Sequence, residues 1–133
     1  MPLENIRYSR EWLKQAKYDI DTAKAMLKAG RNIYCVFMCH LSLEKAFKAL
    51  YVMRVDKNPP KIHSLVYFAQ KVNLDLPRSL KEFIEMLDEV SVPTRYPDEL
   101  EKILKEYSNQ RTKTIFAKTE EFLKWLRAKT DKQ

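Results

Sequence analysis

Apolar residues recur at three- and four-residue spacing along most of the chain, as they do on the buried face of an α-helix. The first such segment, residues 9–29, is predicted to be a helix whose buried stripe comprises Trp12, Ala16, Ile20, Ala23 and Leu27. Ser9 is a suitable N-cap, and Gly30 suits the left-handed residue that ends a helix. Asp19 lies beside the stripe, where an acidic side chain is either solvated or paired with a neighbouring helix.

A second helix is predicted over residues 32–54, with Asn32 as its N-cap. Its apolar positions, again at helical spacing, are Ile33, Val36, Phe37, Leu43, Phe47 and Leu50. His40, Glu44 and Lys48 form a polar column at i, i+4 and i+8 in the same helix. Such a column is either a row of weakly interacting surface residues or a polar seam between two helices or two subunits.

Prolines separate this helix from two shorter ones. Two consecutive prolines lie in a loop over residues 56–61, because they cannot continue a helix. The next helix is predicted over residues 64–72, with inward-facing residues Leu65, Phe68, Ala69 and Val72. Pro77 then suits the first turn of a helix that ends near Val90. Its apolar positions are Leu80, Phe83, Ile84 and Leu87, and its outer face is expected to carry Glu82, Glu85, Asp88 and Glu89.

The remaining sequence predicts a loop over residues 91–98, a short helical turn from Asp98 to Lys105, and a last helix over 109–128. The buried stripe of that helix comprises Ile115, Phe116, Thr119, Phe122, Leu123 and Leu126. Closely spaced helices of this kind predict an all-α fold, an antiparallel up-and-down bundle of four or five helices. The 133 residues form one domain, and a single glycine excludes a hairpin-rich β fold.

The chain is basic, with a formal net charge of +7. Residues 1–31 hold seven basic and four acidic side chains, residues 32–100 hold nine of each, and residues 101–133 hold nine and five. The positive excess therefore lies in the first and last segments. If these segments pack side by side, they form a basic surface that either attracts RNA, DNA or nucleotides or serves only for solubility.

The sequence predicts no metal site and indicates no cofactor. Cys35, Cys39 and His40 share one region of a helix, but structural zinc requires four ligands and the chain has no further cysteine. Two buried thiols are the simpler interpretation. With one glycine, a glycine-rich phosphate-binding loop is also absent. No apolar run approaches the length of a membrane span and the N-terminus has no hydrophobic signal core, so a cytoplasmic location is expected.

Several short phrases occur in a specific order and spacing. They are W-L-K-Q-A-K-Y-D-I-D-T-A (12–23), F-M-C-H-L-S-L-E-K-A-F-K-A-L-Y (37–51), K-I-H-S-L (61–65) and T-R-Y-P-D (94–98). The sequence resembles the HEPN ("higher eukaryotes and prokaryotes nucleotide-binding") domain over residues 8–128, in the subgroup with E-K-A-x-K-A and T-R-Y-P phrases. The resemblance implies a four- to five-helix bundle and a homodimer. Many members pair with a minimal nucleotidyltransferase in toxin–antitoxin-like systems.

Other HEPN proteins are metal-independent RNases that carry an Arg followed four to six residues later by His. This chain departs from that pattern, because its two histidines each follow the nearest upstream arginine by nine positions. Cleavage by the family's usual route is therefore not expected, and no catalytic residue is assigned. His63 is the one candidate base, because it opens a helix after the proline loop; a capping or packing role is the alternative.

The candidate nucleotide- or phosphate-binding residues are Lys45, Lys48, His63, Arg95 and Tyr96. A guanidinium matches phosphate with two parallel hydrogen bonds, lysines add positive potential, and a tyrosine ring can stack on a base. Alternatively, these residues have a structural role, in which Arg95 forms an ion pair with an acid such as Glu44 or Asp19 and Tyr96 is buried at the end of the bundle.

The sequence favours a non-catalytic, homodimeric interaction or nucleotide-binding module that accompanies a small nucleotidyltransferase. The alternatives are a metal-independent RNase toxin with a divergent Arg/His site and a dimer of purely structural use. The dimer is also expected from the second helix, which carries more large apolar residues than one buried stripe needs, among them Phe37, Met38, Phe47, Tyr51 and Val52.

Overall fold

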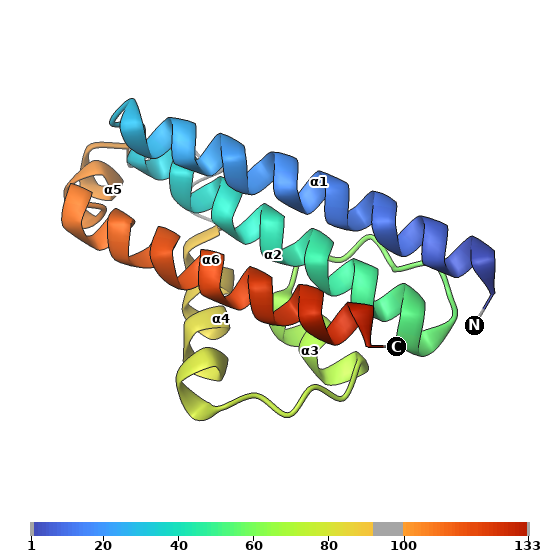
Figure 1. Ribbon diagram of the computed structural model, residues 1–133. Helices are drawn as coiled ribbons and strands as arrows, with labels where there is room; N and C mark the ends of the chain where they lie inside the picture. Colours follow the sequence, from blue (N-terminus) through green and yellow to red (C-terminus); the bar gives the residue numbers. More distant parts are fainter. Residues whose placement is uncertain (1, 92–99, 133) are drawn as a thin grey trace.

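The computed structural model describes residues 2–91 and 100–132, and all regular structure in this part of the chain is helical (Figure 1). The predicted all-α class is confirmed. The elements are α1 (Leu3–Lys28), α2 (Asn32–Val55), α3 (Leu65–Lys71), α4 (Arg78–Ser91), α5 (Leu100–Glu106) and α6 (Asn109–Asp131).

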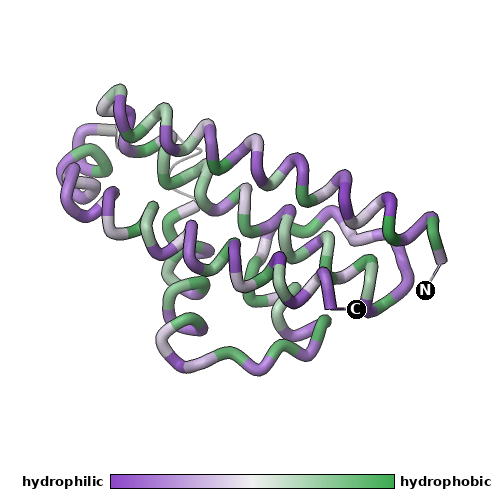
Figure 2. Tube along the Cα trace, viewed as in Figure 1, coloured by the Kyte–Doolittle hydropathy of each residue, from purple (hydrophilic) through white to green (hydrophobic). Residues whose placement is uncertain are grey.

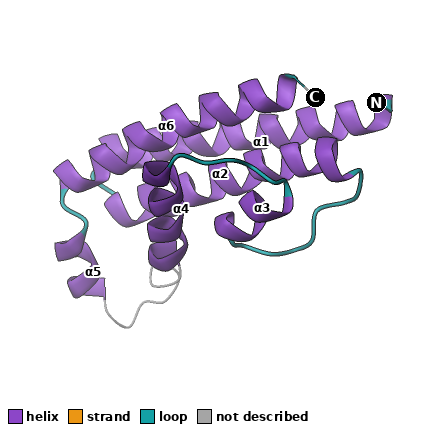
Figure 3. Cartoon of the chain, turned by 90° about the horizontal axis from the view of Figure 1, so that it is seen from below, coloured by secondary structure: helices purple, strands orange, loops and turns teal. Residues whose placement is uncertain are grey.

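The three long helices α1, α2 and α6 lie side by side, and the shorter helices cover the remaining side of α2 (Figures 1 and 3). Helix α1 runs antiparallel to both α2 and α6, so the two chain ends lie at the same end of the molecule (Figure 1). Helices α3 and α4 contact each other and α2, and α4 crosses the direction of the long helices (Figure 3).

Helix α2 is the central element, because α1, α3, α4, α5 and α6 all contact it. Most of its apolar residues are therefore covered within one chain. Phe47 is fully buried, and Tyr51 and Val52 are 8% and 4% exposed, whereas Phe37 and Met38 are only half-buried. Three of the five residues from which the dimer was expected are therefore already covered within the chain.

The rest of the core joins α2 to α6. The rings of Phe47 and Phe122 pack edge to face with centroids 5.8 Å apart, and Phe122 contacts Trp125 in the same way. All six residues of the predicted stripe in α6 are buried. Figure 2 shows the complementary pattern, with hydrophilic residues along the outward side of α1 and α6. Within the described ranges, no helix is long and apolar enough to cross a bilayer.

Some helix ends differ from the prediction. Helix α1 begins at Leu3, so Ser9 is a buried residue inside the helix and not its N-cap. Asn32 is likewise the first residue of α2 and does not cap it; its side-chain amide donates hydrogen bonds to the Tyr107 carbonyl and to Asn109 Oδ1. A tertiary contact thus takes the place of capping at Asn32, whereas Ser9 fails as a cap because the helix begins before it.

The predicted end of α1 is confirmed. Gly30 has a φ of +74°. Its N–H donates a hydrogen bond to the Leu27 carbonyl, and the Arg31 N–H donates one to the Met26 carbonyl. These two bonds satisfy carbonyls that the end of a helix leaves unpaired. Ser64, which the sequence placed at the start of the next helix, is its N-cap, and its side chain accepts a hydrogen bond from the Tyr67 N–H.

Candidate functional site

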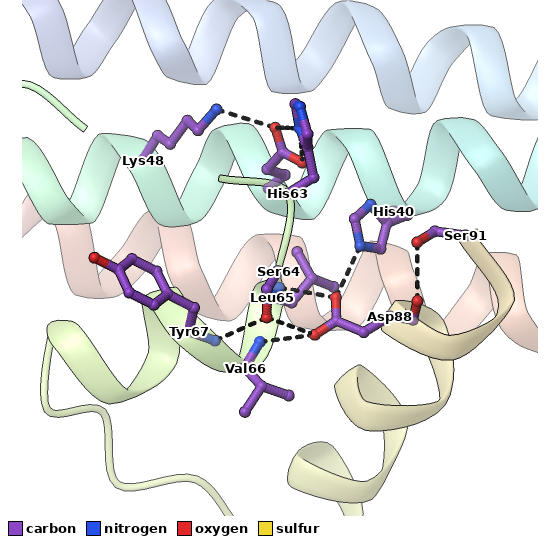
Figure 4. Close-up of polar contacts among 10 residues, drawn as sticks. His40, Lys48, His63, Ser64, Leu65, Val66, Tyr67, Asp88 and Ser91 are labelled. Carbon is purple, nitrogen blue, oxygen red and sulfur yellow. Dashed lines mark hydrogen bonds and ion pairs between the residues drawn. The ribbon is translucent and has the colours of Figure 1, made fainter. Parts of the chain in front are cut away.

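A network of charged and polar side chains lies on the side of α2 that faces α3, α4 and part of α1 (Figure 4). Its central members are the column His40, Glu44 and Lys48, whose residues are only 1%, 2% and 7% exposed. The column is therefore a polar seam between helices of one chain and not a row of surface residues. Burial of these groups is tolerable because each has a partner of opposite charge or a hydrogen-bond partner.

Glu44 lies at the centre of one half of the seam. Its Oε2 is 3.0 Å from Lys48 Nζ, and its Oε1 and Oε2 lie 3.0 and 3.2 Å from His63 Nδ1. Figure 4 shows the Lys48 and His63 side chains approaching this carboxylate from opposite sides. The loop before α3 therefore brings His63 against a buried acid 19 positions away in the chain.

This contact orients the His63 ring. A carboxylate only accepts hydrogen bonds, so the Nδ1 of His63 carries the hydrogen that it donates to Glu44. The Nε2 atom has no hydrogen-bond partner among the described residues, and the His63 side chain is 56% exposed. In the neutral ring Nε2 is a lone-pair acceptor that can take a proton, and in the protonated ring it is a donor that can bind an anion.

The two lysines of the predicted phosphate site are largely committed to partners within the chain. Lys48 Nζ is paired with Glu44 and lies 5.3 Å and 5.7 Å from the ring centroids of Trp12 and Phe68. Lys45 Nζ lies 2.7 Å from the buried Asp19 Oδ2, an ion pair that lacks the alignment of a good hydrogen bond. Asp19 is thus paired with a neighbouring helix, one of the two roles that the sequence allowed.

Asp88 organises the other half of the seam. Its carboxylate accepts hydrogen bonds from the backbone N–H groups of Leu65 and Val66, at 2.8 and 3.1 Å, and from the Ser64 hydroxyl at 3.0 Å. It also accepts one from His40 Nε2 at 2.9 Å. Asp88 therefore binds the N-terminus of α3, where free N–H groups favour an acid. The prediction that Asp88 lies on the outer face of α4 is wrong.

These hydrogen bonds change the acidity of Asp88. Burial by itself would raise the pKa of the carboxyl group, but the hydrogen bonds from His40, Leu65 and Val66 favour the ionised form more strongly. The net effect is a pKa below the ordinary value of an aspartate. The sequence contains a signal for this placement, because Asp88 and Ser91 continue the i, i+3, i+4, i+7 pattern of the buried residues Ile84 and Leu87.

His40 has one satisfied and one unsatisfied ring nitrogen. Nε2 donates to Asp88, while the buried Nδ1 has no hydrogen-bond partner among the described residues. A ring that carries its only hydrogen on Nε2 leaves a bare lone pair in the core, which costs less than an unpaired N–H. His40 therefore links α2 to α4 and the start of α3, and it is too deeply buried to meet a ligand.

The structure brings together three of the five predicted site residues. Lys45, Lys48 and His63 lie around the acids Asp19 and Glu44, whereas Arg95 and Tyr96 lie outside the described residues. The sequence placed Glu44 in the polar column and offered it as a possible partner of Arg95, but it did not predict the contact with His63. The spacing of four residues from Glu44 to Lys48 signals their pairing, but nothing local signals the contact with a loop residue.

The cysteine pair is buried, free of disulfides and outside this seam. The hydrogen bond between Cys39 and Cys35, together with burial, raises the pKa of the Cys39 thiol. The Cys39 thiol is therefore protonated and inert near neutral pH. In the described ranges, no group of three or more His, Cys, Asp or Glu side chains is arranged to hold a metal ion.

No curated protein matches the sequence. Among solved structures, the chain is similar to the crystal structure of TT1696 from Thermus thermophilus, with a TM-score of 0.76 and 21% sequence identity. The match covers 91% of this chain and 97% of that chain, and at this identity it shows a shared fold. The family model described as HEPN domain matches residues 9–129. The chain therefore belongs to the HEPN domain family.

Proposed function

We propose that this protein is a homodimeric, non-catalytic HEPN module that binds a nucleotide and accompanies a minimal nucleotidyltransferase in a toxin–antitoxin-like pair. Membership of the HEPN family, whose members are nucleotide-binding or RNase-type modules, supports the general class. The proposal that the module is non-catalytic rests on one observation, namely that the sequence has no Arg followed four to six residues later by His. Metal-independent cleavage needs a base near the 2′-hydroxyl and a cation near the phosphate.

The proposed nucleotide site is the exposed edge of the seam at His63. The acids Asp19 and Glu44 balance the charges of Lys45 and Lys48, so His63, when its ring is protonated, is the group that adds net positive charge there. Its Nε2 then donates to a phosphate oxygen. In this proposal Arg95 supplies a second, bidentate phosphate contact and Tyr96 a stacking surface.

The test is binding of ATP to the purified protein, measured by calorimetry at low salt. We expect His63→Ala to weaken binding by about tenfold, which corresponds to about 1.4 kcal/mol. The control is Lys81→Ala, which removes an exposed cation from α4. ATP binding that is absent in the native protein, or equal in His63→Ala and Lys81→Ala, would reject this site.

One observation favours the second candidate function, a divergent metal-independent RNase. Glu44 holds His63 with Nδ1 protonated and leaves Nε2 as a base, which is the arrangement of an acid-oriented catalytic histidine. If the protein is such an RNase, the native protein cleaves RNA in the presence of EDTA, and His63→Ala abolishes cleavage without changing the circular dichroism spectrum. Intact RNA after incubation with native protein supports the non-catalytic proposal.

The proposed partner has its own test. When the chain is produced together with a minimal nucleotidyltransferase encoded beside it, the two proteins should elute as one complex in size-exclusion chromatography. Separate elution at micromolar concentrations of both proteins would remove the toxin–antitoxin-like pairing from the proposal, and it would leave the nucleotide site untouched.

A further inference from the structure

A basic groove runs between α1 and α6, on a different side of α1 from the seam. The packing of these two helices confirms that the two basic segments of the sequence lie side by side (Figure 1). The groove consists of three hollows of about 410, 210 and 170 Å³ that share lining residues. The first shares Arg10 and Leu13 with one neighbour, and Lys17 and Arg127 with the other.

Cations line both walls of this groove. Arg10, Lys14, Lys17 and Lys24 come from α1, and Lys124 and Arg127 come from α6. Only Asp21, Glu120 and Asp131 among the lining residues are acidic, and Asp21 is already paired with Lys17 at 2.6 Å. Lys14 pairs with Glu11 on the exposed side of α1.

Four of the lining cations, two from each helix, form no ion pair with any described residue: Arg10, Lys24, Lys124 and Arg127. Two packed helices that face each other with like charges repel, and bundles more often place opposite charges across such a seam. A cationic surface that served only for solubility has no need to converge on one groove. The repulsion is relieved when a polyanion occupies the groove.

We propose that this groove binds the phosphate backbone of single-stranded nucleic acid. Lys24 follows Arg10 by 14 positions, which correspond to about 21 Å along α1 at 1.5 Å per residue. A ligand that satisfies cations over this length carries several phosphates, unlike a mononucleotide. The lining residues follow α1 from Arg10 to Lys24, a linear arrangement that suits the extended backbone of a single strand.

Two features favour nucleic acid over an acidic polypeptide as the occupant. Arg10 and Arg127 line the largest hollow, and guanidinium groups bind phosphate oxygens in a bidentate manner. Tyr18 lies one helical turn after Lys14 in α1 and is 74% exposed, so its ring is available for a base to stack on. Basic grooves with an aromatic surface beside them are typical of single-strand binding.

The inference goes beyond the proposed nucleotide site and does not depend on it. The two sites have no residue in common, because the groove is lined from α1, α6 and Met53 of α2, and the proposed site lies around His63, Lys45 and Lys48. Loss of one function by mutation should therefore leave the other unchanged.

The test is fluorescence anisotropy with an oligouridylate of about 12 nucleotides, within the range of known single-strand sites. We expect the double variant Arg10→Glu/Arg127→Glu to bind it about tenfold or more weakly than native protein. The control variant Lys81→Glu/Lys102→Glu makes the same change in net charge on exposed residues of α4 and α5, and should keep most of the affinity. Equal losses in both variants would overturn the proposal.

Three further measurements keep the test decisive. If the charge-reversed double variant does not fold, Arg10→Gln/Arg127→Gln is used in its place. The plot of log affinity against log salt concentration should then become shallower, by about 0.7 in slope for each phosphate that the variant no longer neutralises. An oligodeoxythymidylate of equal length distinguishes RNA from DNA as the strand. Binding of an oligoglutamate of equal charge as tightly as the oligouridylate would assign the groove to an acidic protein partner and reject nucleic acid.

Discussion

Single buried acids determine the arrangement of the polar residues in this domain. Asp19 pairs with Lys45, Glu44 holds both Lys48 and His63, and Asp88 binds His40 and the start of α3. Each acid joins segments that are distant in the sequence. The two lysines that the sequence offers for a phosphate are therefore already paired, as is the buried His40, and within the seam His63 keeps an exposed ring.

The pairing of Glu44 with Lys48 makes a prediction about stability. Glu44→Gln leaves the Lys48 ammonium buried without a counter-charge, so we expect a loss of about 3 kcal/mol in the free energy of unfolding, measured by urea denaturation. The double variant Glu44→Leu/Lys48→Met removes both charges and should recover most of that loss. If the double variant is no more stable than Glu44→Gln, the loss of stability does not come from the unpaired Lys48 charge, and this explanation is wrong.

Gly30 is the residue whose backbone conformation matters most for the turn between α1 and α2. An added Cβ would meet no neighbouring atom, but the φ of +74° is unfavourable for any other residue type. Gly30→Ala is therefore expected to lower the unfolding free energy by about 1 kcal/mol, and Gly30→Asn by less, because asparagine tolerates this conformation. Thermal unfolding followed by circular dichroism measures both, and a larger decrease in Gly30→Asn contradicts the conformational explanation.

At the scale of elements, the short helix α3 depends on its neighbours. It has seven residues, which is too short to be stable in isolation. It forms because its apolar residues pack on α2 and because Asp88 of α4 satisfies its first N–H groups. A polar residue on α4 thus decides where a separate helix begins.

The low pKa of Asp88 predicts how stability depends on pH. A carboxyl group whose pKa is lower in the folded than in the unfolded chain stabilises the fold above its unfolded pKa of about 3.9, and this contribution disappears as the pH falls through the folded pKa. Asp88→Asn should therefore be less stable than native protein at pH 7, and the difference should shrink below about pH 4. Urea denaturation at a series of pH values measures it, and a constant difference would contradict this origin.

At the scale of the whole molecule, α2 is surrounded by the other helices of its own chain. Most of its apolar residues are therefore buried without a partner subunit. The proposed homodimer rests on membership of the HEPN family and on the surface that stays uncovered, including the half-buried Met38 of α2.

Sedimentation equilibrium tests the dimer directly. We expect a mass near twice 15.9 kDa at micromolar concentration, both at low and at moderate salt, because an interface that buries apolar surface is not screened by salt. A mass of one chain under both conditions would contradict the homodimer. A dimer at low salt only would point to charge complementarity between α1 or α6 and the acidic face of α4.

The predictions that succeeded are those that depend on local pattern. The apolar stripe of α6 and the left-handed end of α1 at Gly30 both follow from residues within one or two helical turns. The failures at Asn32 and Asp88 concern polar side chains whose partners lie on other helices, whereas the one at Ser9 arises because α1 already begins at Leu3.

The sequence alone therefore determined the helices, their approximate ends and the two basic segments, because helical periodicity and charge are properties of neighbouring residues. Only the tertiary structure decided that Glu44 meets His63, 19 positions away, and that Asp88 meets Ser64, 24 positions away. It also placed the cations of α1 opposite those of α6. Such contacts depend on how whole helices pack, and a buried polar group takes whichever partner that packing brings within hydrogen-bond distance.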